Sequence, residues 1–214
     1  MIVYGSSLSP FVRKVLVFGM EKGLELELRP TGLNSDDPEF LEASPFRKMP
    51  AFRDGDFAIS DSSAIVAYLE AVHPEPNLIP LEPRARARTI WFDEFADTIL
   101  GVCATRMFFN RIVSPRFLRR DGDLAIAEKA EREELPPILD YLERTIPESG
   151  HLVEDRLTLA DIAVASLFVN LGHLELDLGL KQRPRLAGFL TGILSRPGFV
   201  HYAEREARFL DRTA

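Results

Sequence analysis

His73-Pro74-Glu75-Pro76-Asn77-Leu78-Ile79-Pro80-Leu81-Glu82-Pro83 divides this sequence into two parts. Four prolines in eleven residues exclude both a helix interior and a central strand, because each proline lacks the backbone N–H that those structures use. Leu78 and Ile79 are apolar, so we expect this linker to pack against the protein. The linker predicts one domain at 1–76 and another at 83–214.

The part before the linker alternates between strand and helix patterns. A turn over 5–9 follows the first strand, Pro10 suits a first helical position, and Asp54-Gly55-Asp56 suits a hairpin turn. The predicted strands are Met1–Tyr4, Leu24–Arg29, Ala51–Arg53 and Phe57–Ile59, and the predicted helices are Pro10–Lys22, Asp36–Ala43 and Ser62–Val72. Their order is β-α-β-α-β-β-α, which indicates a small α/β domain.

The part after the linker has the apolar periodicity of helices and no clear strand. Thr158-Leu-Ala-Asp161 is a capping box before an apolar run, which makes Asp161 a structural cap in our interpretation. The predicted helices are Arg84–Val113, Leu124–Thr145, Leu159–Leu171, Arg185–Leu194 and Phe199–Phe209. This second domain is therefore predicted to be all-helical.

Composition excludes several functional classes. The chain has 214 residues, a formal charge of −7 and a single cysteine, Cys103, so a disulfide framework, a cysteine-rich metal centre and a CxxC redox pair are excluded. The negative charge argues against binding of nucleic acid or of an anionic membrane. No apolar run approaches the ~20 residues of a membrane span, and the start Met1–Gly5 has no basic leader region. We therefore expect a cytoplasmic protein.

Four local motifs stand in order along the chain. They are Ser9-Pro10-Phe11-Val12-Arg13-Lys14, Lys48-Met49-Pro50-Ala51-Phe52, Ile59-Ser60-Asp61-Ser62-Ser63-Ala64-Ile65 and Thr158-Leu-Ala-Asp161. With these motifs and the element order, the whole chain resembles the glutathione S-transferases. The Ser-Pro-Phe start is most similar to tau-type and bacterial members that use serine. The resemblance implies an α/β thioredoxin-like domain, an all-α C-terminal domain, and glutathione as co-substrate.

The resemblance assigns the catalytic role to Ser9. Its hydroxyl would donate a hydrogen bond to the glutathione sulfur and stabilise the thiolate, which is the reactive form. The alternative for Ser9 is simple capping of the helix that begins at Pro10. A second alignment, in which Ser6-Ser7-Leu8 resembles the Ser-Ser-Cys stretch of zeta-type members, would make Ser6 the active serine.

The resemblance also implies a set of glutathione-binding residues. Met49 would precede a cis-proline, Pro50, and pair its backbone with the cysteinyl part of glutathione. Asp61 and Ser62 would bind the γ-glutamyl group, and Lys48 the glycyl carboxylate. The alternatives are an ordinary trans proline, plain helix capping by Asp61 and Ser62, and a solvated lysine. Asn34 and Ser35 stand where a second lysine for the glycyl carboxylate often occurs in the family, so no residue of this chain is assigned to that second contact.

The second substrate would be a small electrophile bound against the helical domain. Its apolar wall would draw on no more than two of the candidates Trp91, Phe92, Phe95, Phe108 and Phe109. Residues 105–120 carry five arginines and no acid, which predicts a solvated basic face or, alternatively, an entrance that attracts anions. The four histidines show no paired ligand spacing, so no metal is expected.

These expectations describe a homodimeric enzyme that adds glutathione to electrophiles. A glutathione-dependent isomerase, dehalogenase or peroxidase would use the same scaffold, because a fold does not determine one chemistry. A non-catalytic glutathione-binding domain is the alternative outside the enzymes. Thiol exchange of the kind catalysed by cysteine-using members is disfavoured, because the turn at 5–9 has no cysteine.

Overall fold

The computed structural model describes residues 1–32 and 34–213, and it divides into two compact units, Met1–Ile79 and Pro80–Ala214. The division falls inside the proline-rich linker. Residues 77–79 belong with the first unit, because Asn77, Leu78 and Ile79 all donate hydrogen bonds to Glu70. Leu78 and Ile79 are buried, as their apolar character predicts.

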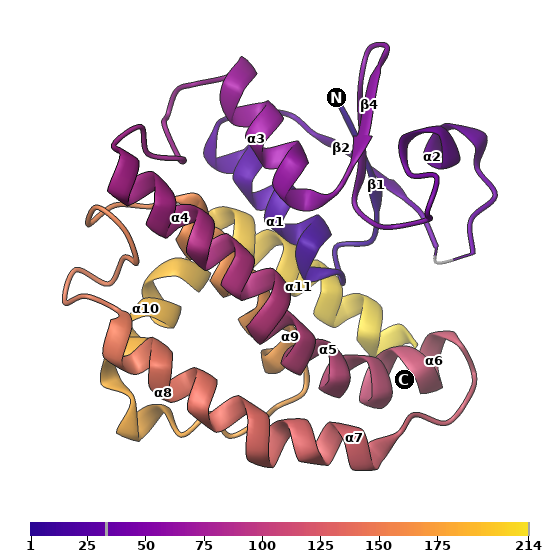
Figure 1. Ribbon diagram of the computed structural model, residues 1–214. Coiled ribbons are helices and arrows are strands. Elements are labelled where there is room, and N and C mark those ends of the chain that lie inside the picture. The colour runs from indigo at the N-terminus through magenta and orange to yellow at the C-terminus, as the bar shows by residue number, and fades with distance from the viewer. Residues whose placement is uncertain (33, 214) are drawn as a thin grey trace. The chain divides into compact units, whose positions relative to one another are not determined.

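The first unit is a four-stranded sheet with helices on both faces (Figure 1). Its elements are β1 (Ile2–Gly5), α1 (Pro10–Glu21), β2 (Glu27–Pro30), α2 (Pro38–Ala43), β3 (Ala51–Asp54), β4 (Phe57–Ser60) and α3 (Ser62–Val72). The strand order is β2-β1-β3-β4, with β2 parallel to β1 and with β3 and β4 in antiparallel pairs. Helices α1 and α3 pack together, and α2 lies on the opposite face. The predicted order of elements is confirmed.

Two predicted boundaries in this unit are wrong. The strand predicted from Leu24 begins only at Glu27, because the N–H of Leu24 donates to the carbonyl of Gly19 and completes the turn that ends α1. The helix predicted from Asp36 begins at Pro38, because the Asp37 carboxylate accepts from the N–H of Glu39 and caps it. A Cβ atom on Gly19 would lie 2.4 Å from Cδ1 of Leu26, so a larger residue at 19 would force the Leu26 side chain to move.

The second unit has no strand among its described residues, as predicted. Its α-helices are α4 (Pro83–Phe95), α5 (Gly101–Phe108), α6 (Ser114–Phe117), α7 (Leu124–Lys129), α8 (Leu135–Thr145), α9 (Leu159–His173), α10 (Pro184–Leu194) and α11 (Pro197–Arg212). Short π-helical segments at 96–100, 109–113 and 130–134 join some of them into longer helical runs, and a 3-10 turn spans 180–182.

The π-helical segments explain why two predicted long helices appear as several elements. The run predicted at 84–113 continues to Phe117, and the run predicted at 124–145 keeps its bounds. In the second run, the π-helical segment ends just before Pro136 and Pro137, which lack the N–H groups needed for regular helical bonds.

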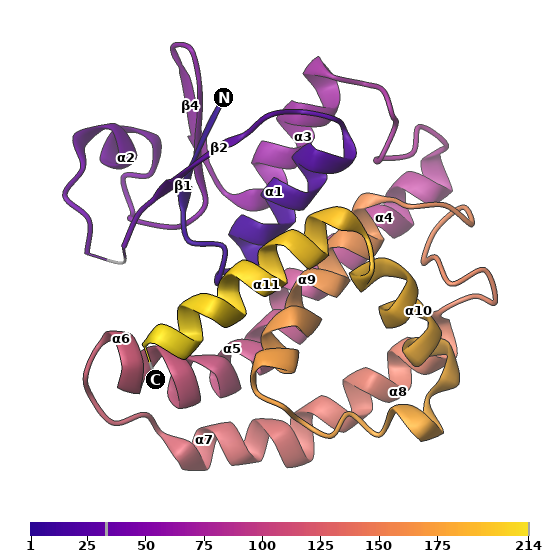
Figure 2. The same ribbon diagram turned by 180° about the vertical axis from the view of Figure 1, so that it is seen from behind.

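Helix α9 forms the centre of the second unit (Figure 2). Every residue from Leu159 to Leu171 is buried, and α9 packs against α4, α5, α10 and α11. A helix that is buried on all sides is mostly apolar, and α9 has only three polar residues between Leu159 and Leu171: Asp161, Ser166 and Asn170. The predicted capping box is confirmed, because Asp161 Oδ2 accepts from the N–H of Thr158 at 2.8 Å.

Candidate functional site

Three of the four motifs meet at one end of the sheet. In the register, Tyr4 pairs with Ala51 and Ala51 pairs with Ser60. The end of β1, the start of β3 and the end of β4 are therefore neighbours. A Cβ atom on Gly5, the last residue of β1, would lie 3.5 Å from Cβ of Met49, so the end of β1 approaches the second motif closely. The helices that follow, α1 and α3, both begin at this end of the sheet.

The hydroxyl of Ser9 does not cap α1, although Ser9 occupies the capping position. Its backbone N–H donates to the carbonyl of Ser6 at 2.9 Å, and its carbonyl accepts from Arg13, but its side chain makes no capping bond. No described residue is a hydrogen-bond partner of this hydroxyl. The alternative that Ser9 serves only as a side-chain cap therefore lacks its defining contact. A half-buried hydroxyl remains at the positive end of a helix.

Ser6 and Ser7 differ from Ser9 in their surroundings. Ser6 Oγ accepts from the N–H of Leu8 at 3.4 Å, a long contact within the turn. Ser7 is buried. Of these three serines, only Ser9 combines partial exposure with an unused hydroxyl at the start of α1. The local geometry thus favours Ser9 over Ser6 as the residue that contacts a ligand.

The Met49–Pro50 peptide bond is cis, as the resemblance implied. Ser44, which is fully buried, holds the preceding residue: its hydroxyl donates to the carbonyl of Lys48 and accepts from the N–H of Lys48, both at 2.8 Å. Among the described residues, neither the backbone N–H nor the carbonyl of Met49 has a partner. The Lys48 side chain is exposed. A peptide-like ligand can therefore pair with Met49 as an added strand.

Asp61 caps α3 and holds an unusual backbone conformation. Its Oδ1 accepts from the N–H groups of Ser63 and Ala64 at 2.9 and 3.0 Å, so the capping interpretation is confirmed for this side chain. Both bonds end on one oxygen, which leaves Oδ2 for an ammonium group. The φ angle is 85°, a conformation that costs roughly 1–3 kcal/mol in a residue other than glycine. Such a cost is commonly found at binding sites.

Ser62 is the first residue of α3 and only 3% exposed. Its hydroxyl has no hydrogen-bond partner among the described residues. Its hydroxyl and its own backbone N–H are donors at the start of α3, with a helix dipole behind them, whereas the N–H groups of Ser63 and Ala64 are held by Asp61. This arrangement suits a carboxylate.

A buried lysine that the sequence reasoning missed connects the two helices. Lys14 Nζ donates to Ser63 Oγ at 3.2 Å, and Lys14 is almost fully buried in α1. Arg13 is buried beside it in the sequence. The sequence signal for this buried lysine is the pair Arg13-Lys14, which interrupts the otherwise apolar stretch 11–19. Positive charge therefore lies close to the first turns of both helices, where an anionic ligand is favoured.

The aromatic candidates for an electrophile wall separate into two groups. Phe92, Phe95 and Phe108 are buried core residues. Trp91 is 48% exposed, with its indole N–H donating to the hydroxyl of Tyr141 at 3.0 Å, and Phe109 is half-buried. This division agrees with the expectation that no more than two of the five candidates are accessible.

The arginine-rich stretch is less basic than the sequence predicted, because two of its five arginines form ion pairs with acids outside it. Arg106 pairs with both carboxylate oxygens of Glu134 at 2.6 Å, and Arg111 pairs with Glu131 at 2.5 Å. Arg116 donates to the carbonyl of Leu210. The acids lie outside the window 105–120, so a count within that window missed them. The ion pairs of Arg106 and Arg111 reduce the power of this stretch to attract anions over a distance.

Other expectations concern cysteine, metals and membranes. Cys103 is buried, its thiol lies 3.6 Å from the carbonyl of Ala130, and burial raises its pKa to about 11. It is therefore a packed, unreactive thiol, as predicted.

Within residues 1–32 and 34–213, no cluster of three or more His, Cys, Asp or Glu side chains could hold a metal ion. The same residues contain no helix that is both long enough and apolar enough to cross a membrane.

Comparison with known proteins places both units. Residues 3–77 match the family described as "Glutathione S-transferase, N-terminal domain", and residues 111–206 match "Glutathione S-transferase, C-terminal domain". The maize (Zea mays) protein named glutathione S-transferase 3 is 30% identical over 203 residues, covering 92% of this chain and 90% of that protein.

Solved structures agree with these matches. Glutathione transferase F7 from Populus trichocarpa superimposes with a TM-score of 0.82 at 26% identity, covering 95% of this chain and 97% of that one. A glutathione S-transferase from Methylobacterium radiotolerans, solved in complex with glutathione sulfonate, has a TM-score of 0.77 at 25% identity, covering 94% and 93%.

Proposed function

The chain belongs to the glutathione S-transferase family and is a glutathione transferase, and on that premise we propose that Ser9 activates the glutathione thiol for attack on small electrophiles. The observation that carries the proposal is the hydroxyl of Ser9, which stands at the start of α1 and caps nothing. A hydroxyl in that position can donate to a sulfur anion. A free thiol has a pKa near 8.5, so stabilisation of the anion at neutral pH increases the reactive fraction.

We propose that the rest of glutathione lies across the same end of the sheet. The cysteinyl backbone pairs with the free N–H and carbonyl of Met49, next to Pro50. The γ-glutamyl carboxylate accepts from the hydroxyl and the backbone N–H of Ser62, and the γ-glutamyl ammonium contacts Oδ2 of Asp61. The exposed ammonium of Lys48 faces the glycyl carboxylate. The two carboxylates of glutathione are thus matched with donors and its ammonium with an acceptor.

The reaction that follows needs little further chemistry from the protein. The thiolate attacks an electrophilic carbon, either by substitution on an activated aryl halide or by Michael addition. Trp91 and Phe109 are the accessible aromatic residues that we propose for contact with the electrophile. Detoxification of such compounds in the cytoplasm is the role that we propose for this chain. Isomerase, dehalogenase or peroxidase chemistry would begin from the same thiolate.

The decisive experiment titrates the thiolate of bound glutathione by its ultraviolet absorbance. Ser9→Ala should raise the pKa of the bound thiol and reduce kcat by roughly 10- to 100-fold, because one hydrogen bond to a charged group contributes about 1.5–3 kcal/mol. Binding should weaken less than turnover, because the lost contact is made to the reacting anion. Ser6→Ala and Ser7→Ala are the matched controls and should stay within a few-fold of wild type. A thiol pKa that moves in Ser6→Ala but not in Ser9→Ala would assign catalysis to Ser6.

A second experiment tests the carboxylate site independently of catalysis. Ser62→Ala removes a donor to a charged acceptor, so calorimetry should show glutathione binding weakened by about 1–3 kcal/mol. Ser149→Ala, which removes the hydroxyl of an exposed serine in the second unit, is the control and should leave the affinity unchanged. Unchanged affinity in Ser62→Ala would remove this serine from the site.

We also propose that the chain forms a homodimer. The Phe46 side chain is 86% exposed, although it stands only two residues before Lys48. An aromatic ring left in water at a functional edge is a feature of association surfaces. Light scattering should give about twice the monomer mass of 24.1 kDa. Phe46→Ala should weaken the dimer, whereas Leu81→Ala, which changes a similarly exposed residue, should not; a monomeric wild-type protein would contradict the proposal.

A further inference from the structure

The helical unit contains a hollow that the proposed glutathione chemistry does not use. It has a volume of about 400 Å³, and its lining residues come from the C-terminal parts of α9 and α10 and from the chain that connects these two helices. We call it the leucine pocket, because six of its ten lining residues are leucines. The lining residues are Phe168, Leu171, Gly172, Glu175, Leu176, Leu178, Leu180, Leu190, Thr191 and Leu194.

The pocket has the size of a site for a small organic molecule. Ligand sites commonly measure 300–1,000 Å³ and are mostly apolar. At the ~30 Å³ that each water molecule occupies in the liquid, 400 Å³ corresponds to about a dozen non-hydrogen atoms. Leu190 is buried and the other leucines are half-buried or buried, so an apolar molecule here would replace water on their surfaces.

The polar groups around the leucine pocket all favour positive charge. Glu175 is the only ionisable residue of the lining, and among the described residues its exposed carboxylate has no partner. Helices α9 and α10 end at His173 and Leu194, so the last turns of both, which carry the partial negative charge of a helix, contribute to the lining. The Thr191 hydroxyl already donates its hydrogen to the carbonyl of Ala187, so it has no hydrogen to donate to a ligand in the pocket.

We propose that the leucine pocket binds small apolar amines in their protonated form. The hydrocarbon part of the amine contacts the leucines, and the ammonium group lies by Glu175 and the two helix ends. This preference is opposite in sign to that of the proposed glutathione site, where two helix N-termini and Lys48 favour an anion. The two sites also share no residue, since the pocket is built from positions 168–194 and the glutathione candidates lie between 9 and 62.

The test compares three naphthalene probes of nearly equal size that differ in charge. Naphthylmethylamine is cationic at neutral pH, naphthalenemethanol is neutral, and naphthoate is anionic. Calorimetry on the full chain, with saturating glutathione present to occupy the other site, should show the amine binding roughly 2- to 5-fold more tightly than the alcohol, and naphthoate most weakly. Equal affinities, tighter binding of naphthoate, or no binding of the amine at millimolar concentration would overturn the proposal.

Two variants locate the binding. Gly172→Phe should abolish binding, because a Cβ atom at Gly172 meets nothing within 4 Å and the ring can occupy the pocket without displacing backbone. Gly172→Ala, which adds only a methyl group, should bind almost as wild type. Glu175→Gln should remove the preference for amine over alcohol. Asp155→Asn is its matched control, since Asp155 is also exposed with a positive φ but does not line the pocket.

These outcomes separate the pocket from the proposed enzyme function. Gly172→Phe should keep glutathione conjugation and the helical circular dichroism of wild type, so lost amine binding cannot be attributed to unfolding. Should that variant fail to fold, Glu175→Gln carries the test alone. Amine binding that persists in Gly172→Phe, or an equal loss in Asp155→Asn and Glu175→Gln, would show that the amine binds elsewhere. A loss of conjugation in Ser9→Ala has no bearing on this result.

Discussion

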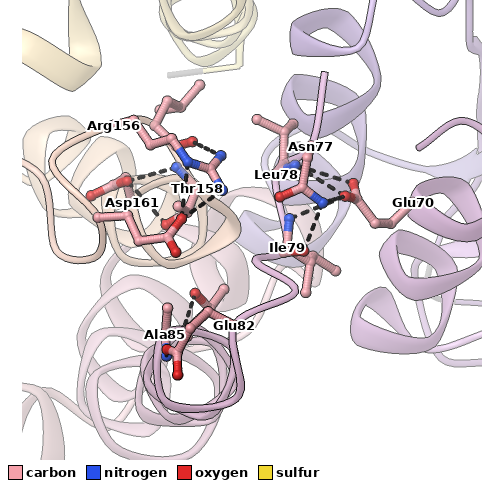
Figure 3. A network of polar contacts seen from close by, with 12 residues as sticks. Glu70, Asn77, Leu78, Ile79, Glu82, Ala85, Arg156, Thr158 and Asp161 are labelled. Atoms are coloured by element: carbon pink, nitrogen blue, oxygen red, sulfur yellow. Dashed lines mark hydrogen bonds and ion pairs between the residues drawn. The ribbon is translucent and has the colours of Figure 1, made fainter. Parts of the chain in front are cut away.

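Removing the carboxylate of Glu70 should destabilise the protein more than removing any single charged side chain that is exposed to solvent. Glu70 accepts from four donors. Three of them, Asn77 Nδ2 at 2.7 Å and the N–H groups of Leu78 and Ile79 at 3.1 and 3.2 Å, are seen in Figure 3. The fourth is Lys22 Nζ at 2.7 Å. Through these bonds, one carboxylate fixes the start of the linker to α3. The side chain of Lys22 is 0% exposed, so its ammonium depends on protein acceptors.

The magnitude follows from what Glu70→Ala leaves behind. Loss of one partner of a buried ion pair costs about 3–5 kcal/mol, because the other charge stays buried. Lys22 retains the carbonyl of Pro76 at 2.7 Å, which reduces this cost. The orphaned N–H groups of Leu78 and Ile79 each cost roughly 1–3 kcal/mol, less wherever water reaches them. Because these contributions overlap, we expect a total near 4–6 kcal/mol, a large part of a typical stability of 5–15 kcal/mol.

Urea denaturation followed by circular dichroism measures this free energy. Glu204→Ala is the matched control: it breaks the Arg208–Glu204 pair, in which both side chains are 63% exposed, and should change stability by less than about 1 kcal/mol. Lys22→Met in combination with Glu70→Ala removes the stranded charge, so the double variant should be more stable than Glu70→Ala alone. If Glu70→Ala loses less than about 1 kcal/mol, or if the double variant shows no such recovery, the reasoning about this buried pair is wrong.

Three further perturbations have definite expected outcomes. Asp161→Ala should lower the thermal midpoint, because it leaves buried backbone donors unpaired at roughly 1–3 kcal/mol each; a midpoint equal to wild type would contradict this. Cys103 should resist alkylation by iodoacetamide at pH 8 in the native state and react in urea, since burial raises its pKa to about 11; equal rates would show an accessible thiol. Gly19→Ala should destabilise by about 1–3 kcal/mol through the clash with Leu26, whereas Gly188→Ala, in open space within α10, should be neutral or stabilising; denaturation curves that rank them the other way refute the packing argument.

The order and type of the elements followed from local sequence, because local chemistry determines them. Pro10 begins α1, Asp54-Gly55-Asp56 turns β3 into β4, and the capping box at Thr158 begins α9. Each of these features acts over a few residues, so it can be recognised without knowledge of distant partners. The boundary of β2 could not be predicted in this way, because Leu24 completes a turn with Gly19 that competes with strand pairing.

The candidate site was predictable as a set of residues but not as a geometry. Resemblance to a family selected Ser9, Lys48, Met49, Asp61 and Ser62, which are scattered over more than fifty positions. Only the register of β1, β3 and β4 brings their segments to one end of the sheet. Whether a serine at a helix start caps the helix depends on the rotation of one side chain, which the sequence does not specify.

Charge and cavities depended on the tertiary structure most of all. Residues 105–120 read as uncompensated positive charge until the fold placed Glu131 and Glu134 beside Arg111 and Arg106. The ion pair of Lys22 with Glu70 joins residues 48 positions apart, and the leucine pocket forms where α9 and α10 end together. Local patterns determine elements because their energies are local, whereas salt bridges and hollows depend on which distant side chains packing brings into contact.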